Sequence, residues 1–178
     1  DWKMTSQKRR ILLFTGEGKG KTTAALGMAL RACGHGMRVR IIQFIKADPT
    51  TGEAAAVSHL PGVELIQTGL GFVPPESMLN TPGNGRLPNG ILLAEEAVLS
   101  DQYDLIVLDE ICNAIALHLL TEEKVISVVR QAGSCRTIVL TGRDAPESLL
   151  SLADTVTIMT CFKHAMTAGR PSEKGVEY

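Results

Sequence analysis

The stretch that decides the fold is TGEGKGKTTAALG, Thr15 to Gly27, which follows a short apolar run and leads into a helix-forming segment. A glycine loop between a strand and a helix lets successive backbone N–H groups converge on phosphate oxygens. Lys21 can reach the same oxygens, and the Thr22 hydroxyl can bind a divalent cation. Gly16, Gly18 and Gly20 alternate, which would let a ligand approach the backbone closely. The stretch therefore predicts a phosphate-binding loop.

The opening of this loop is unusual. The common spacing G-x-x-x-x-G-K-[ST] places Thr15 where the first glycine normally stands. A glycine-rich turn without a ligand is the simpler alternative, but GKGKTT between an apolar run and a helical pattern favours a nucleotide site. The residues predicted to bind the nucleotide are Gly16, Glu17, Gly18, Lys19, Gly20, Lys21, Thr22 and Thr23.

Strand and helix patterns alternate along the chain on both sides of the loop. Strands are predicted at residues 9–15, 38–45, 62–67, 103–110, 136–142 and 154–160. Helices are predicted at residues 22–33, 52–59, 91–100, 122–133, with Thr121 as N-cap, and 146–153. Residues 68–90, rich in Gly, Pro and Asn, are predicted to form a long loop. This order predicts an α/β fold of the P-loop NTPase-like (RecA-like) type, with a mainly parallel sheet and helices on both faces.

A pair of carboxylates supplies the second part of the predicted site. In LIVLDE, four apolar residues precede Asp109 and Glu110, which places both acids at the carboxyl end of a buried strand. Ligands of parallel α/β sheets bind at this edge. Either acid, together with Thr22, can hold Mg²⁺, because hard cations take oxygen ligands. Arg143 follows another strand and is predicted to reach phosphate or ribose at the same rim, although a surface arginine is nearly as compatible with the pattern.

Length and charge narrow the remaining possibilities. A chain of 178 residues suits a single domain, 1–178, with an N-terminal arm at 1–8 and a polar C-terminal tail at 163–178. The formal net charge of −1 argues against a nucleic-acid partner. Four scattered cysteines and the lack of an apolar run near the roughly 20 residues of a membrane span indicate a reduced, cytoplasmic protein.

Taken together, several motifs resemble the ATP:corrinoid adenosyltransferases of the CobA/BtuR/CobO type. The resemblance runs in the same order from about Ile11 over nearly the whole chain. The motifs are TGEGKGKTTAALG, HGMRVRIIQFIK, GLGF, YDLIVLDEI, VLTGRDAP, ADTVTIM and KHAMTAG…KGVEY. That family has a shortened phosphate loop that holds ATP in the reverse sense from ordinary P-loop hydrolases. A residue other than glycine at Thr15 agrees with this pattern.

The resemblance implies transfer of the 5′-deoxyadenosyl group of ATP to the Co(I) of a corrinoid, cobalamin or a precursor, with release of triphosphate. It implies ATP, a corrinoid and Mg²⁺ (or Mn²⁺) as reactants and cofactor, with Lys21 and Phe72 in catalytic roles. In the family, aromatic residues of a GF-x-W segment fill the lower face of the corrinoid. Here Gly71 and Phe72 match this segment, but Pro74 stands at the tryptophan position. A reductase, either flavodoxin-like or a flavin, and a homodimer are the further partners implied.

Three other functions remain open at this stage. A P-loop phosphotransferase or ATPase would use the same loop and could recruit Arg143 to the transferred phosphate. A non-catalytic nucleotide- or corrinoid-binding regulator would bind ATP without forming product. A RecA-like motor on DNA is disfavoured by the charge balance and the short chain.

Overall fold

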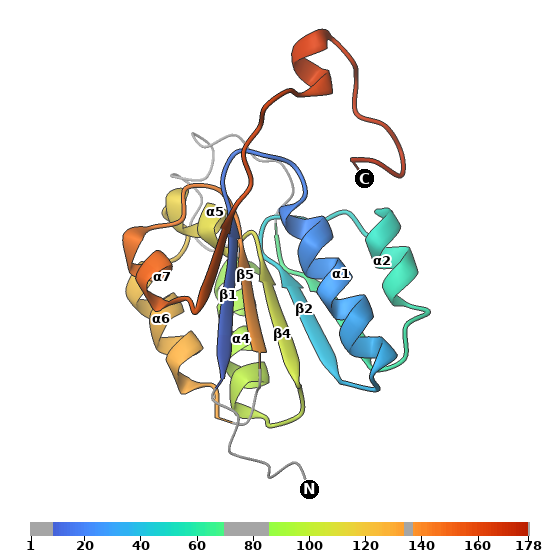
Figure 1. The fold of residues 1–178 in the computed structure, drawn as a ribbon. Helices are drawn as coiled ribbons and strands as arrows, with labels where there is room; N and C mark the ends of the chain where they lie inside the picture. The colour runs from blue at the N-terminus through green and yellow to red at the C-terminus, as the bar shows by residue number, and fades with distance from the viewer. Residues whose placement is uncertain (1–8, 70–85, 134–136, 178) are drawn as a thin grey trace, which may run out of the picture.

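The computed structural model describes residues 9–69, 86–133 and 137–177, and within them six parallel strands form one sheet in the order β3-β2-β4-β5-β1-β6 (Figure 1). Apolar runs build the central strands because both faces of such a sheet are covered. The strands are β1 (Arg10–Thr15), β2 (Val39–Gln43), β3 (Val63–Gln67), β4 (Leu105–Asp109), β5 (Thr137–Thr141) and β6 (Thr155–Ile158).

Helices lie on both faces of the sheet, as the sequence predicts. Two of them, α1 and α2, cover one face, while α4, α5, α6 and α7 pack on the other (Figure 1). Their bounds are α1 (Lys21–Gly34), α2 (Gly52–Val57), α4 (Arg86–Leu99), α5 (Ile111–Ala116), α6 (Glu122–Gln131) and α7 (Glu147–Leu152), with a short 3-10 helix, η1 (Ala165–Ala168), in the tail. None of the helices in the described segments is long and apolar enough to cross a membrane.

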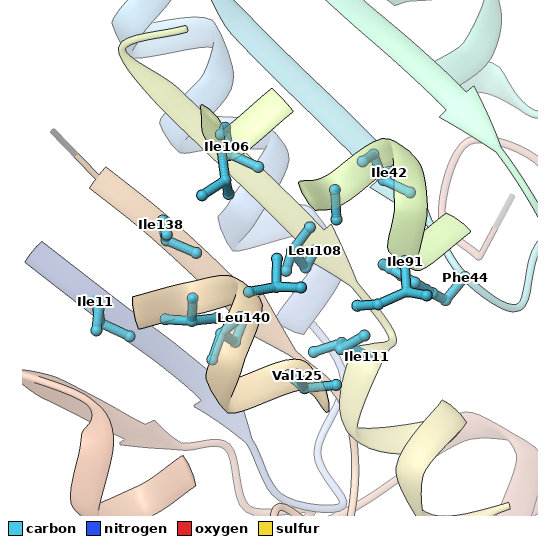
Figure 2. Packing of buried hydrophobic residues seen from close by; sticks show 14 of the residues in the cluster. Ile11, Ile42, Phe44, Ile91, Ile106, Leu108, Ile111, Val125, Ile138 and Leu140 are labelled. Carbon is cyan, nitrogen blue, oxygen red and sulfur yellow. The ribbon is translucent and has the colours of Figure 1, made fainter. Parts of the chain in front are cut away.

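The core divides into two apolar layers because alternate strand residues point to opposite faces. On β2, Ile41 packs with α1 and Ile42 packs with α4, and both are fully buried. On β4, Val107 and Leu108 divide between the two layers in the same way. Figure 2 shows the larger layer, in which Phe44 contributes a buried aromatic ring. These layers hold the carboxyl ends of β1, β2, β4 and β5 together at one edge.

The strand predictions are confirmed, each to within a few residues, and Thr121 caps α6 by accepting a hydrogen bond from the backbone of Lys124. One helix prediction is wrong in extent, and one helix is absent from the predictions. α4 begins at Arg86, so residues 86–90 are helical and not part of a loop, whereas residues 70–85 lie outside the described residues. α5 was not predicted, because its six residues continue the apolar run of β4 and contain no starting signal except Glu110.

Gly69 lies where the chain leaving β3 crosses the end of β2, and replacing it with alanine is expected to destabilise the fold. A Cβ atom there would overlap the carbonyl group of Ile45 and lie 2.7 Å from the backbone nitrogen of Lys46. Gly69→Ala is therefore expected to lower the free energy of unfolding, measured by urea denaturation, by about 1–3 kcal/mol.

Gly27→Ala is the matched control, since Gly27 lies inside α1 and an added Cβ would meet nothing within 4 Å. Alanine there should stabilise the protein by about 0.5–1 kcal/mol. If the Gly69 variant were as stable as the parent protein, the close crossing at Ile45 would be contradicted.

Candidate functional site

The predicted phosphate-binding loop joins the end of β1 to the start of α1 at the carboxyl edge of the sheet (Figure 1). Gly16 and Gly20 have φ values of +97° and +112°, a region that glycine enters without steric penalty. Gly20 directly precedes Lys21, the first residue of α1. The unpaired N–H groups of the first helical turn therefore lie next to the loop, where the helix dipole favours an anion.

Two of the three alternating glycines are required by the protein's own backbone. Gly18 donates its N–H to the Met159 carbonyl at 2.6 Å, just after β6. A Cβ on Gly16 or Gly18 would lie 2.5 or 2.7 Å from the same carbonyl oxygen. Only at Gly20 would a Cβ meet nothing nearer than the Met159 sulfur, at 3.5 Å. The alternation of glycines is therefore also required for the loop to pack against the end of β6.

Lys21 reaches back across the loop. Its Nζ donates to the carbonyl oxygens of Gly16 at 2.6 Å and Gly18 at 2.7 Å. Burial and the nearby Arg143 guanidinium lower the pKa of the Lys21 ammonium. The ammonium is thus fixed over the loop and retains a third N–H that it can direct to a phosphate oxygen.

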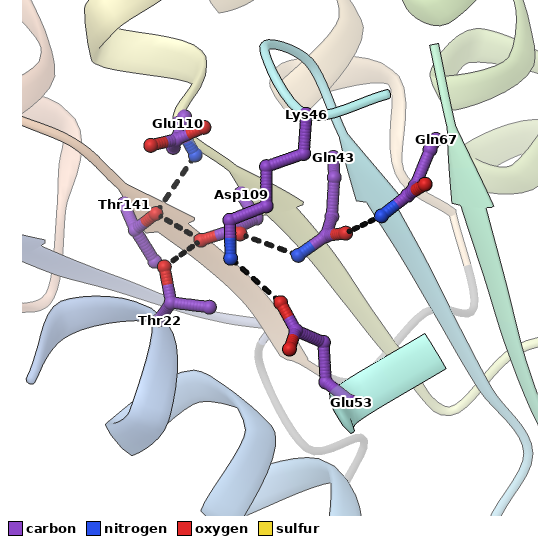
Figure 3. A network of polar contacts seen from close by, with 8 residues as sticks. All are labelled: Thr22, Gln43, Lys46, Glu53, Gln67, Asp109, Glu110 and Thr141. Atoms are coloured by element: carbon purple, nitrogen blue, oxygen red, sulfur yellow. Dashed lines mark hydrogen bonds and ion pairs between the residues drawn. The ribbon is translucent and has the colours of Figure 1, made fainter. Parts of the chain in front are cut away.

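Asp109 is the centre of a buried hydrogen-bond network (Figure 3). Its Oδ1 accepts from the hydroxyls of Thr22 at 2.9 Å and Thr141 at 2.7 Å. Its Oδ2 accepts from the side-chain amide of Gln43 at 3.1 Å. Only 1% of Asp109 is exposed. The carboxylate is therefore occupied by donors from three other elements, α1, β5 and β2.

Glu110, the next residue, has a different environment. Its backbone lies in the left-handed region at φ 61°, which turns the chain sharply between β4 and α5, and its N–H donates to the Thr141 hydroxyl at 2.8 Å. Its Oε2 is buried and has no hydrogen-bond partner among the described residues. Burial, followed by the neighbouring Asp109 charge, raises the pKa of Glu110 to about 7. An unpaired buried carboxyl oxygen of this kind is a candidate cation ligand.

A cavity of about 770 Å³ brings most of the predicted residues together. Its lining includes the loop from Glu17 to Thr23, and also Glu110 and Arg143. Gly16 and Asp109 are not part of this lining. The described residues contain no cluster of three or more His, Cys, Asp or Glu side chains arranged to hold a metal ion by themselves. A cation here would therefore need oxygens from Thr22 or from the ligand itself.

Three further cationic side chains in the described part of the cavity wall form ion pairs with carboxylates. The pairs are Lys19–Glu177 at 3.6 Å, Arg143–Glu17 at 3.5 Å and Lys46–Glu53 at 2.6 Å. The first two pairs are long and substantially exposed, and such pairs contribute little to stability. A polyanionic ligand can therefore replace those carboxylates at small energetic cost.

Sequence reasoning missed Gln43 and Lys46, which the structure adds to the site. Gln43 is a fully buried polar residue at the end of an otherwise apolar strand, and Lys46 lines the cavity three residues later. The rule that indicated Asp109, a polar residue at the carboxyl end of a parallel strand, applies equally to RVRIIQFIK. The same signal therefore marks Gln43 at the end of β2.

The structure describes the C-terminal tail but not the segment predicted to contact the corrinoid. Val176 and Glu177 of the tail line the cavity, and Glu177 pairs with Lys19 of the phosphate loop. The tail therefore closes one side of the site in spite of its exposure. Phe72 and Pro74 lie outside the described residues.

A glycine loop at a helix N-terminus, its lysine, and an acidic pair at the end of a neighbouring parallel strand define a P-loop nucleotide-binding protein. Residues 7–178 match the model of the family described as ATP:corrinoid adenosyltransferase BtuR/CobO/CobP, and the chain belongs to that family.

Curated relatives agree with this assignment. The chain is 37% identical over 169 residues to the corrinoid adenosyltransferase CobA of Salmonella typhimurium, covering 94% of this chain and 85% of that protein. It is 35% identical over 169 residues to the corrinoid adenosyltransferase of Pseudomonas aeruginosa, covering 94% and 83%. It is 33% identical over 177 residues to that of a Sinorhizobium species, covering 98% and 82%.

Proposed function

We infer that this chain is an enzyme that transfers the 5′-deoxyadenosyl group of ATP to the Co(I) of a corrinoid, in cobalamin biosynthesis or salvage. The observation that carries this inference is the family match over residues 7–178, which includes both the phosphate loop and the tail that closes the cavity. The same resemblance favours this reaction over hydrolysis of ATP and over a non-catalytic role.

The reaction requires the protein to position C5′ of ATP and to stabilise the leaving triphosphate. It does not require the protein to activate a nucleophile. The Co(I) electron pair forms a bond to C5′ of ATP, the C5′–O bond breaks, and triphosphate leaves with that bonding pair. Lys21, the N–H groups at the start of α1, and Lys19 or Arg143 offer positive charge to the leaving triphosphate. In-line placement of C5′ supplies the remaining acceleration.

Mg²⁺ (or Mn²⁺) fits this site through two side chains. We propose that Glu110 and the Thr22 hydroxyl oxygen hold the ion, because the Glu110 Oε2 has no other described partner and Thr22 lines the cavity. Asp109, with three donors already bound, orients Thr22. When bound, the ion neutralises charge on the triphosphate.

The remaining assignments extend this proposal. Gly16 to Thr23 and Arg143 bind the nucleotide, and Phe72 contacts the lower face of the corrinoid. Residues 1–178 form one domain with an arm and a tail. The enzyme works in the cytoplasm as a homodimer and receives electrons from a flavodoxin-like reductase or a reduced flavin.

The proposal is tested by adding the protein and MgATP to chemically reduced cob(I)alamin. The expected result is the absorption spectrum of adenosylcobalamin together with one intact triphosphate for each product formed. Release of ADP and phosphate without corrinoid would establish a hydrolase instead. Tight ATP binding with no adenosylated product would establish a nucleotide-binding regulator.

A further inference from the structure

Gln43 occupies a position that the mechanism above does not use. It is the last residue of β2, its side chain is fully buried, and its amide lies between Asp109 of β4 and Gln67 of β3 (Figure 3). A buried amide at the end of an apolar strand carries a desolvation penalty unless its polar atoms are paired. In this structure both ends of the amide are paired.

The orientation of this amide follows from its partners. The Gln43 Nε2 donates to Asp109 Oδ2 at 3.1 Å, and an ionised carboxylate can only accept. The Gln43 Oε1 accepts from Gln67 Nε2 at 2.9 Å. A flipped Gln43 amide would place its oxygen against the carboxylate and its NH₂ against the Gln67 NH₂. The two glutamines therefore specify a single direction, with the donor facing Asp109.

The backbone next to Gln67 is itself hydrogen-bonded to the end of β2. Thr68 donates its backbone N–H to the Gln43 carbonyl at 2.9 Å, and Gly69 donates to the Lys46 carbonyl at 3.1 Å. These bonds continue the β2–β3 ladder past the last strand residues. The backbone that carries Gln67 is therefore held beside β2, within hydrogen-bond distance of the Gln43 amide.

The orientation of the Asp109 carboxylate in turn fixes the direction of the Thr22 hydroxyl hydrogen. A threonine hydroxyl has one hydrogen, and the Thr22 hydrogen is used in the bond to Asp109 Oδ1. The lone pairs of Thr22 Oγ1 are what remain for the cavity, so this oxygen suits a hard cation and disfavours a bare phosphate oxygen. If Asp109 rotated, the Thr22 hydroxyl could turn its hydrogen toward the cavity.

We propose that Gln43, supported by Gln67, is a positioning residue for the divalent cation, acting through the direction of Asp109 and the Thr22 hydroxyl. This inference rests on the proposed function only in assuming that a cation accompanies triphosphate in the cavity. Its effect is on cation affinity. The proposed contact of Lys21 with phosphate does not depend on Gln43.

The test measures binding of inorganic triphosphate by calorimetry across a series of Mg²⁺ concentrations, without corrinoid. Gln43→Met keeps the size of the side chain and removes the donor. It is expected to raise the Mg²⁺ concentration for half-maximal binding by up to about tenfold, the lower end of the range for losing a direct partner of a metal ligand, because Gln43 acts one contact further away through Asp109. Affinity without Mg²⁺ should stay within about twofold, because the phosphate loop is unchanged.

The test includes a matched control, Arg40→Met, and a second variant of the Gln43 network, Gln67→Met. Arg40→Met removes another polar side chain of β2 that bonds to β3, through Glu64, but does not contact Asp109, so its Mg²⁺ midpoint should not move. Gln67→Met should raise the Mg²⁺ midpoint as Gln43→Met does, but by less. If the Gln43 variant does not fold, the Gln67 variant provides the test.

An unchanged Mg²⁺ midpoint in a folded Gln43 or Gln67 variant would overturn the inference, and so would an equal loss of affinity with and without Mg²⁺. Both results come from triphosphate binding alone. A protein that binds MgATP but makes no adenosylated corrinoid would refute the proposed function and leave this test intact.

Discussion

Lys21→Ala is expected to lower kcat/KM for ATP by about 10²–10³, the range found when one preorganised donor to a developing anion is removed. The Lys21 ammonium is held over the loop by two carbonyl oxygens, so it is already in place when the triphosphate leaves. Alanine also removes the bonds that close the loop around Gly16 and Gly18. The measurement is steady-state adenosylation of chemically reduced cob(I)alamin at varied ATP.

Lys19→Ala is the control for this prediction. Lys19 also lies in the loop, but its ion pair with Glu177 is long and its side chain is 44% exposed. Solvent screens such a charge, so its removal should cost no more than about tenfold in kcat/KM. Near-normal turnover of the Lys21 variant, or equal losses in both variants, would contradict the role assigned to Lys21.

Glu110→Gln is expected to raise the divalent-cation concentration required for half-maximal activity by about 10-fold or more. The substitution keeps the shape of the side chain but removes the charge of the buried carboxylate whose Oε2 has no described partner. Activity is measured at fixed ATP while Mg²⁺ is varied. An unchanged cation requirement would transfer the ligand role to Asp109.

The same substitution should remove a dependence of stability on pH. Burial and the Asp109 charge raise the pKa of Glu110 from 4.5 to about 7. Between these values the folded protein binds more protons than the unfolded chain, so the free energy of unfolding falls as the pH rises from 4.5 to 7. The contribution is of the order of 3 kcal/mol.

Unfolding experiments without divalent cations test this directly. At pH 4, below both pKa values, the parent protein and Glu110→Gln should be about equally stable, because both side chains are largely neutral in the folded and the unfolded states. At pH 8 the parent protein should be the less stable of the two, and Mg²⁺ with triphosphate should restore its stability by binding the ionised carboxylate. Parallel stability curves for the two proteins would show that Glu110 has an ordinary pKa.

Much of the fold was predictable because its signals are local. Each buried strand is a short apolar run, and each run ends at a glycine, an acid or an amide that stands at the carboxyl edge. The phosphate loop needed only its neighbours in sequence to be recognised. Thr121, followed by Glu122 and Glu123, likewise marks the start of α6. The start of α4 differs from the prediction because Pro88 and Gly90 predict a loop, whereas a proline in the first turn of a helix breaks no hydrogen bond of that helix.

The site was less predictable because its contacts join distant parts of the chain. Lys46 and Glu53 form an ion pair in the cavity wall, but the motif that ends at Lys46 does not indicate that Glu53 is its partner. The Met159 carbonyl, which explains Gly16 and Gly18, is more than a hundred residues from the loop that it contacts. Such proximity follows from the order of strands in the sheet, with β6 beside β1.

The sequence by itself determined that a phosphate loop and an acidic pair would meet at one edge of a parallel sheet, because spacing and strand direction are enough for that. Only the tertiary structure decided how the two acids differ. Asp109 ends a strand and faces donors from β2, β5 and α1, whereas the left-handed backbone at Glu110 leaves its carboxyl oxygen buried without a described partner. Adjacent carboxylates thus acquire different chemistry from the neighbours that folding gives them.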